Sequence, residues 1–135
     1  MRVEAHSGAA GSDITDRVQD FLKRHSIRDG FVVVTCLCPT AAVTVARGEP
    51  PILADLVETL RSLIKEGTAY SHEDPANPAY EGESAAPYLR GAFLGQTASV
   101  SVVRGRLMLA EHQRLILIEL NGRASRAVHV QFLGV

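Results

Sequence analysis

The chain carries two cysteines two positions apart, within the stretch FVVVTCLCPTAAVTV at residues 31–45. If a strand continues through the first of these residues, Cys36 and Cys38 project from the same face, which places a thiol at a strand end. The thiolate of Cys38 could act as a nucleophile with His72 as its base, a role that requires a lowered thiol pKa. Free cysteine is also among the most buried residue types, so a packing role for Cys38 stays open.

The segments on either side of the cysteines contain the residues that must hold them in place. Runs rich in valine predict two strands, at about 31–37 and 41–45. Pro39 interrupts the hydrogen-bond ladder between them because it has no backbone N–H. The alternating segment Arg2–His6 could add a first strand at the N-terminus.

Three helices are predicted around these strands. The first lies within residues 13–25, where apolar side chains recur at helical spacing. The second begins at Pro50-Pro51, has a wide apolar stripe that covers a sheet, and ends at Gly67. The third is a short helix over Tyr88–Leu94, although Gly91 is a poor helix former.

The last third of the chain is typical of an antiparallel sheet. A tight turn is predicted at Arg104-Gly105, between strands at 99–103, 107–109, 115–120 and 127–133. Both faces of the segment 115–120 are apolar, which predicts burial on both sides, either by a second layer of the domain or by another subunit. The carboxylate of Glu119 then lies among leucines, so a partner for its charge is expected.

One long segment, Thr68–Pro87, has no hydrophobic period and contains several prolines and acidic residues. Loops of this length in compact domains are usually functional or disordered. Tyr70, His72 and Asp74 lie near its start, so a binding loop and a solvated linker are both open.

Composition excludes several classes of protein. A length of 135 residues predicts a single domain over 1–135. A net charge of −1 disfavours nucleic acid and anionic membranes as partners. No apolar run is long enough to cross a bilayer, and the N-terminus lacks the apolar core of a signal peptide, so we expect a cytoplasmic protein in a reducing compartment.

A series of short motifs, in one register from Asp13 to Gly134, resembles the YjbQ family, often called the secondary thiamine-phosphate synthase family. The motifs are DITDxV, DGFVVV, PTAAVTV, YSHED, YLRGAFLG, GRLML, ELNGR and AVHVQFLG. The resemblance implies an α+β fold, a two-layer β-sandwich of mostly antiparallel strands with two to three helices. It also implies a homotrimer with sheets packed around the threefold axis.

The resemblance further implies a polar site, part of which this chain alters. Cys38 and Tyr88 stand where the family usually has histidines, whereas His72 is retained. In the intact family, three histidines would suit a divalent metal such as zinc. Here Cys38 and His72 could still bind a metal, with Asp74, Glu119 or His112 completing the set. Catalytic roles are implied for His72, Asp74 and Glu119.

Phosphate recognition is the other chemistry that the resemblance implies, because thiamine-phosphate synthesis joins a pyrimidine to a thiazole phosphate with loss of pyrophosphate. Guanidinium groups bind phosphate oxygens in a bidentate way, and neutral side chains add hydrogen bonds. The candidates for binding such a substrate are Thr40, Arg90, Gln113, Arg123 and Arg126. For any one of the arginines taken alone, a solvated surface charge is the favoured interpretation.

Two functions follow from these observations. The first is a trimeric enzyme with thiamine-phosphate synthase-like activity on a small, phosphorylated molecule, at a polar site between subunits. The second is a degenerate family member that has lost catalysis through Cys38 and Tyr88 and serves as a binding or structural trimer.

Overall fold

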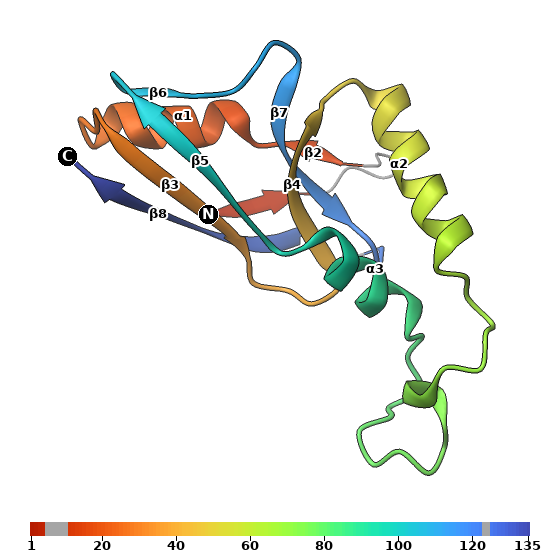
Figure 1. The fold of residues 1–135 in the computed structure, drawn as a ribbon. Coiled ribbons are helices and arrows are strands. Elements are labelled where there is room, and N and C mark those ends of the chain that lie inside the picture. The colour runs from red at the N-terminus through yellow and green to blue at the C-terminus, as the bar shows by residue number, and fades with distance from the viewer. Residues whose placement is uncertain (5–10, 123–124) are drawn as a thin grey trace.

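The computed structural model describes residues 1–4, 11–122 and 125–135, with the backbone only for residues 2–4. The strands form two curled sheets, and the helices pack around them (Figure 1). In chain order the elements are β1 (Arg2–Glu4), β2 (Ser12–Asp13), α1 (Thr15–Arg24), β3 (Gly30–Cys36), β4 (Ala41–Arg47), α2 (Pro50–Leu63), the 3-10 helix η1 (Ser71–Glu73), α3 (Ala86–Leu94), β5 (Thr97–Val103), β6 (Arg106–Leu107), β7 (Gln113–Glu119) and β8 (Ser125–Gly134).

The strands form an antiparallel sandwich. The larger sheet has the order β1-β8-β3-β5-β6 and the smaller sheet the order β2-β7-β4. Every strand pair is antiparallel, and β3 pairs with β8 on one side and β5 on the other. The predicted α+β sandwich is therefore confirmed. The predicted strand over Arg2–His6 is found only to Glu4, because residues 5 and 6 lie outside the described residues.

The main core lies between the two sheets and is closed on one side by α1. Alternate residues of each strand point into it because successive side chains of a strand point to opposite faces. Its buried side chains are Ile14 just before α1, Val18 and Leu22 from α1, Val32, Val34 and Cys36 from β3, Ala41 and Val43 from β4, Val100 and Val102 from β5, Leu115 and Leu117 from β7, and Val128 from β8.

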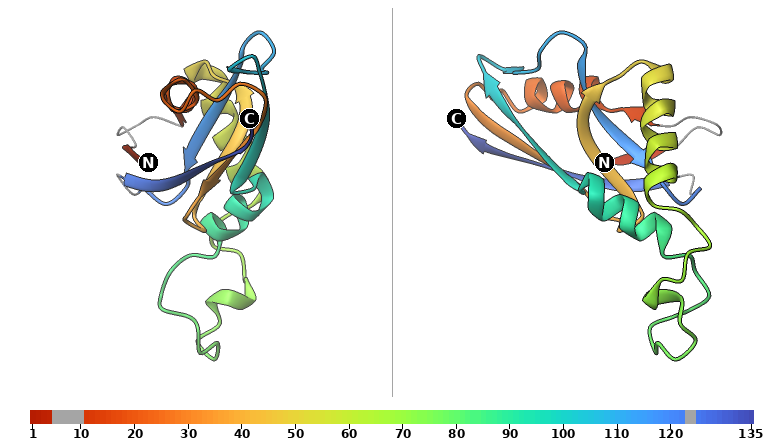
Figure 2. Two further views of the ribbon diagram at one scale, coloured as in Figure 1. Left: turned by 90° about the vertical axis from the view of Figure 1, so that its left-hand side faces the viewer. Right: turned by 45° about the vertical axis from the view of Figure 1, so that its right-hand side comes forward.

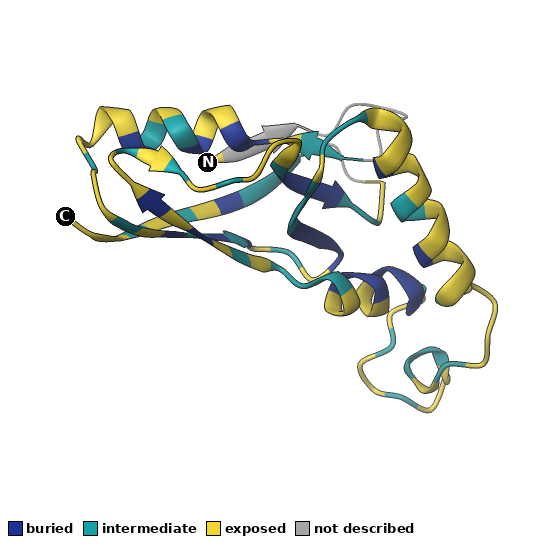
Figure 3. Cartoon of the chain, turned by 45° about the horizontal axis from the view of Figure 1, so that its top comes forward, coloured by how far each residue is buried: buried dark blue, intermediate teal, exposed yellow. Residues whose placement is uncertain are grey.

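A second, smaller core lies on the other face of the small sheet, under α2. It contains Ile116 and Ile118 of β7, Ala42 of β4 and Leu53 of α2. The two-sided burial predicted for 115–120 is thus provided within one subunit, by the larger sheet on one face and by α2 on the other. Figure 3 shows this pattern, with buried residues inside the sandwich and a mostly exposed outer surface on α2.

The segment between α2 and α3 forms a lobe that projects from the sandwich (Figure 2). The lobe, residues 65–84, contains no buried residue and has η1 as its only helix. The predicted loop is therefore confirmed except for this short helix and for its last residues, because α3 begins at Ala86 instead of Tyr88. Pro87 suits the first turn of α3, where the missing N–H has no intrahelical partner.

The turn before β6 is the predicted one, since Arg104 and Gly105 both adopt positive φ angles of 52° and 78°. The returning strand β6 is shorter than predicted, because only Arg106 and Leu107 pair with β5. None of the helices in the described part of the chain has the length and apolar character needed to span a bilayer.

Candidate functional site

An ion pair between Glu119 and Arg126 lies where β7 ends and β8 begins. The guanidinium binds the carboxylate in a bidentate way, with Nε donating to Oε2 and Nη2 donating to Oε1, the latter at 2.7 Å. The two side chains are only 9% and 12% exposed. The backbone N–H of Asn121 also donates to Oε1, at 2.7 Å. Arg126 is thus the partner that the sequence predicted for the carboxylate of Glu119.

Thr40 connects this pair to the cysteines. Its hydroxyl accepts a hydrogen bond from Nη2 of Arg126 at 3.2 Å and lies 3.3 Å from Sγ of Cys38. Thr40 itself is buried, and its carbonyl accepts a hydrogen bond from the N–H of Leu120. We call these four residues, Cys38, Thr40, Glu119 and Arg126, the polar cluster.

The charges of the polar cluster favour a fixed guanidinium. The hydrogen bond to Glu119 raises the pKa of Arg126 above its usual value, so this side chain stays charged. Burial and the nearby Cys38 raise the pKa of the neighbouring thiol of Cys36. Cys36 is therefore a neutral packing residue, and it is Cys38, half-buried beside Thr40, that faces the polar atoms.

His72 lies in a separate cluster in the lobe. Its Nε2 is 2.5 Å from Oε1 of Glu83, and its ring contacts the rings of Tyr80 and Tyr88, with centroids 5.9 and 5.7 Å away. The carboxylate of Glu83 accepts hydrogen bonds from the backbone N–H of Glu83 itself, from the backbone N–H of Glu81 and from the side chain of His72. These hydrogen bonds lower the pKa of Glu83. The side chains of His72 and Tyr88, which are 16 positions apart in the sequence, therefore lie against each other.

The helix α3 joins the two clusters. Gly91 packs so closely on the segment after Cys38 that a Cβ there would lie 2.6 Å from the carbonyl oxygen of Pro39. Gln96, just after α3, donates a hydrogen bond to the same carbonyl at 3.2 Å. Tyr88 lies one helical turn before Gly91, so one rigid element carries the contact to His72 and the contact to Pro39, which stands between Cys38 and Thr40 of the polar cluster.

Two predicted substrate-binding residues have structural partners elsewhere. Arg90 is buried, and its Nε and Nη2 donate to the carbonyl of Ile64 at 3.0 and 2.7 Å, which caps the C-terminus of α2. Gln113 is exposed at the start of β7, while Glu119 ends the same strand. Six residues of extended chain separate them by roughly 20 Å, so one subunit does not bring these two side chains together.

Asp74 and Arg123 are the two remaining residues that the sequence predicted for the site. Asp74 is exposed, and its carboxylate accepts a hydrogen bond from the N–H of Ala76 at 2.9 Å, as in an Asx turn. Arg123 lies outside the described residues.

The residues proposed as metal ligands do not form a zinc site within one subunit. Among the described residues, no three histidine, cysteine or acidic side chains are grouped so that they could hold a metal ion. Cys38 contacts a hydroxyl, and Nε2 of His72 faces Glu83. His112, the other candidate ligand, lies near Glu49 and Glu111 before β7. We therefore derive no chemical step through a metal.

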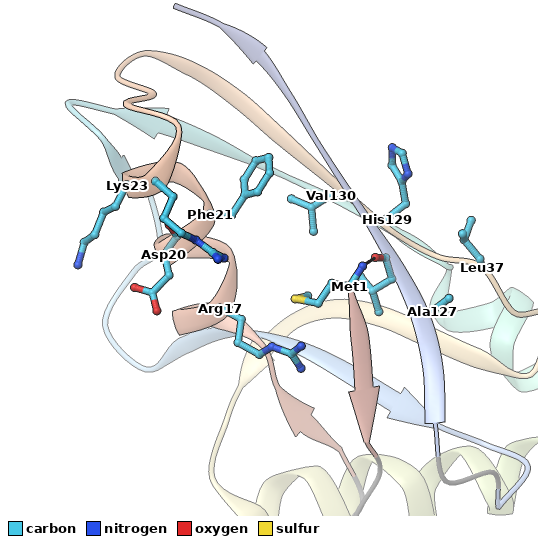
Figure 4. Close-up of a pocket in the computed structure, with 11 residues that line it drawn as sticks. Met1, Arg17, Asp20, Phe21, Lys23, Leu37, Ala127, His129 and Val130 are labelled. Atoms are coloured by element: carbon cyan, nitrogen blue, oxygen red, sulfur yellow. Dashed lines mark hydrogen bonds between the residues drawn. The ribbon is translucent and has the colours of Figure 1, made fainter.

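Sequence reasoning missed Tyr80 and Glu83 as neighbours of His72. Glu83 was a candidate because it is one of several acidic residues in the same loop. However, nothing in the sequence specifies how that loop folds back on itself. Sequence reasoning also missed a hollow between α1 and β8, into which Met1, Phe21 and Val130 point (Figure 4).

Comparison with known proteins gives a consistent result. The family model described as UPF0047 protein YjbQ-like matches residues 1–135. A UPF0047 protein of Archaeoglobus fulgidus is 31% identical over 121 residues, 90% of this chain and 89% of the relative. The UPF0047 protein YugU of Bacillus subtilis is 26% identical, over 90% of this chain and 88% of its own length.

Solved structures show the same fold. A hypothetical protein of Aeropyrum pernix K1 superposes with a TM-score of 0.85 at 30% identity, covering 100% of this chain and 96% of that chain. A YbjQ-like protein of unknown function from Sulfolobus solfataricus superposes with a TM-score of 0.85 at 24% identity, covering 100% and 94%, and supports the fold alone.

Proposed function

The chain belongs to the UPF0047 protein YjbQ-like family, and we propose that it is a small-molecule enzyme with thiamine-phosphate synthase-like activity, centred on the polar cluster. One observation carries the proposal. Arg126 is a nearly buried cation that a carboxylate and a threonine hold in one orientation. Preoriented cations in sites that exclude water are what a reaction that moves phosphate charge requires.

The proposed reaction forms a carbon–nitrogen bond between the pyrimidine methylene carbon and the thiazole nitrogen. The carbon–oxygen bond to pyrophosphate breaks, and pyrophosphate leaves with the bonding electrons. Negative charge therefore grows on the leaving group, where a guanidinium stabilises it. Within the described residues Nη1 of Arg126 makes no hydrogen bond, whereas Nε and Nη2 are bound to Glu119 and Thr40. Nη1 is the donor we assign to phosphate.

The other residues of the polar cluster have supporting roles in this proposal. Glu119 orients Arg126 through two hydrogen bonds, and Thr40 offers a hydroxyl beside the same guanidinium. The proposed catalytic role of His72 draws support from Glu83, since a carboxylate against an imidazole nitrogen orients the ring. Asp74 stays a candidate only through its place two residues after His72. Arg123 is retained as a possible second phosphate ligand by its place in the sequence.

We further propose that the protein is a homotrimer. The outer face of the larger sheet has no helix over it (Figure 2) and exposes Phe31, Val103 and Leu133 by 44%, 44% and 49%. Large apolar side chains grouped on one sheet face are typical of a subunit interface. Sedimentation equilibrium of the full chain should then give three times the chain mass of 14.5 kDa.

The alternative is a binding or structural protein that has lost the family's chemistry. Two observations favour this alternative. No group of the described residues could hold a metal ion. Cys38 and Tyr88 also stand where the resemblance implies histidines. An enzyme and a binding protein both require a ligand at the polar cluster, so an assay of turnover is needed to distinguish them.

The test incubates the full chain with hydroxymethylpyrimidine pyrophosphate and thiazole phosphate and measures thiamine phosphate as fluorescent thiochrome. The wild type should form product, and Arg126→Gln should lower the rate by about a hundredfold, as expected when one preorganised charge is removed. Arg47→Gln is the matched control, because Arg47 forms an exposed pair with Glu49, and it should keep the wild-type rate.

A different result would support the alternative. If the wild type forms no product but Cys38→His with Tyr88→His does, the chain has lost the family's chemistry through these two changes. Equal rates for wild type and Arg126→Gln would overturn the role given to Arg126.

A further inference from the structure

A second hollow, of about 480 Å³, lies where the C-terminal end of α1 meets the turn between β5 and β6. Figure 1 shows β6 beside α1. Four cations line this hollow: Lys23 from α1, Arg28 from the loop after it, Arg104 from the turn and Arg106 from the start of β6. Among the described residues, no carboxylate lines it. We call it the cationic hollow.

The charged groups of these four side chains form no ion pair in the described part of the chain. Asp29 follows Arg28, but its Oδ1 accepts a hydrogen bond from the backbone N–H of Arg104 at 3.0 Å. A chain end at Val135 would add a second carboxylate, since the carbonyl of Val135 accepts hydrogen bonds from the N–H groups of Arg28 and Asp29. Cations exceed carboxylates even with both counted, so the hollow attracts an anion.

The cationic hollow is remote from the elements that flank the undescribed residues. β1 pairs with Ser125–Ala127 at the start of β8, and β2 precedes the N-terminus of α1. The hollow lies at the other end of α1 and near the other end of β8, because Gly30 pairs with Gly134. Ala127 and Gly134 are separated by roughly 23 Å of extended strand. The described residues therefore supply the charges that face the hollow.

Hydrogen bonds fix the two walls of the cationic hollow against each other. The side-chain amide of Gln19 donates to the carbonyl of Gly105 at 2.7 Å, and its oxygen accepts from the N–H of Leu107 at 3.1 Å. The N–H of Gly105 donates to the carbonyl of Arg28 at 2.8 Å. An anion therefore meets a preformed frame and does not have to order these loops when it binds.

The backbone at the hollow is unusual at two residues. Ser26 and Arg104 have φ angles of 51° and 52°, and His112 is the only other non-glycine residue with a positive φ in the described part of the chain. Positive φ at both Arg104 and Gly105 is typical of a type I′ hairpin turn, which prefers asparagine, aspartate or glycine at its first central position. An arginine at that position costs stability, which indicates that its side chain has a role.

We propose that the cationic hollow binds the phosphate chain of a small polyphosphate, either inorganic triphosphate or the triphosphate of a nucleotide. Guanidinium groups bind phosphate oxygens in a bidentate way, and a polyphosphate places several negative charges within reach of all four cations. The volume of the hollow is within the roughly 300–1,000 Å³ that is usual for small-ligand sites. The net charge of −1 disfavours nucleic acid as the source of the phosphates. The site shares no residue with the polar cluster, so it goes beyond the proposed function.

The experiment titrates the full chain, without a tag, with inorganic triphosphate and with inorganic phosphate in a calorimeter. Triphosphate should bind at least about tenfold more tightly, because it can contact several cations at once. Added sodium chloride should weaken the binding, since salt screens exposed charges. ATP forms the third titration. An affinity equal to that of triphosphate assigns the site to the inorganic chain, and a tenfold higher affinity assigns it to a nucleotide.

Two variants test the cations of the hollow. Arg106→Gln should weaken triphosphate binding by about tenfold, as expected when one charged hydrogen-bond donor is lost. Arg104→Asn should weaken it by a similar factor and yet raise the melting temperature, because asparagine suits the first position of a type I′ turn. A merely structural role of Arg104 would not produce that opposite pair of changes. Arg61→Gln removes the same charge from α2, where Arg61 is 60% exposed, and should leave the affinity unchanged.

Backbone amide resonances locate the ligand and separate this site from the polar cluster. Triphosphate should shift the amides of residues 26–28 and 104–106 by the same amounts in the wild type and in Arg126→Gln. Equal affinity for phosphate and triphosphate would overturn the proposal. So would an affinity that Arg106→Gln and Arg104→Asn leave unchanged, or amide shifts that disappear in Arg126→Gln.

Discussion

The sandwich and the lobe each hold a carboxylate against a nitrogen base, but in different surroundings. In the sandwich, Glu119 and Arg126 are about nine-tenths buried and also bond to Thr40 and Asn121. In the lobe, Glu83 and His72 are 28% and 34% exposed, and no residue from 65 to 84 is buried. The contacts are alike in chemistry, yet only the first is built into a core. The lobe can therefore open locally without unfolding the sandwich, whereas the polar cluster cannot.

The largest expected effect comes from breaking the buried pair. Glu119→Ala leaves the charge of Arg126 nearly buried without a partner, so it should lower the free energy of unfolding by about 3–5 kcal/mol. Glu49→Ala, which breaks the exposed pair with Arg47, should leave the free energy of unfolding nearly unchanged, because solvent screens an exposed pair. Urea denaturation measures both. A double variant, Glu119→Leu with Arg126→Met, should recover much of the loss, and equal losses in the two single variants would contradict the contrast.

Two glycines give the next largest difference. Gly91→Ala places a methyl group against the carbonyl of Pro39 and should cost about 1–3 kcal/mol in global stability, despite alanine's higher helix propensity. Gly82 has a positive φ of 87° in open space, so Gly82→Ala should cost about 1 kcal/mol and only within the lobe. Thermal unfolding should therefore detect Gly91→Ala, and hydrogen exchange of lobe amides should detect Gly82→Ala.

Acid should weaken the start of α1 through Asp13. Burial raises the pKa of Asp13, but hydrogen bonds from Thr15 and Arg114 outweigh it and hold the pKa below its usual 3.8. A carboxyl with a lowered folded-state pKa contributes stability above the unfolded value and loses it as the pH falls through the folded value. Asp13→Asn should therefore cost about 1 kcal/mol or less at neutral pH and nothing near pH 2. A pH-independent loss would contradict this assignment.

The smallest global effect is expected for His72→Ala. Because His72 is a third exposed and its partners all lie in the lobe or at Tyr88, the free energy of unfolding should change by less than about 1 kcal/mol. Hydrogen exchange at residues 71–84 should nevertheless accelerate, while exchange in β7 stays unchanged. Faster exchange in β7 would show that the lobe is part of the sandwich's cooperative unit.

The sequence predicted the elements whose pattern is strongly periodic. Val32, Val34 and Val43 point into one core because strand alternation requires it, and the stripe of α2 packs on β7 as expected. The start of α3 was missed because its first residues, Ala86 and Pro87, are also typical of a loop.

The candidate site was less predictable because it depends on tertiary contacts. The need of Glu119 for a partner follows from its apolar neighbours, but the choice of Arg126 depends on how β8 is placed beside the end of β7. Arg90 was predicted to bind substrate, with a solvated surface charge as the alternative, and only the approach of α2 shows that it caps the carbonyl of Ile64.

The backbone contact between Met1 and Val128 has a practical consequence for handling the protein. The ammonium group of Met1 donates to the carbonyl of Val128, so an affinity tag fused before Met1 would replace this ammonium group by an amide and would begin beside β8. A tag after Val135, which is 83% exposed, leaves the contact between Met1 and Val128 intact. It therefore suits the stability and turnover measurements above.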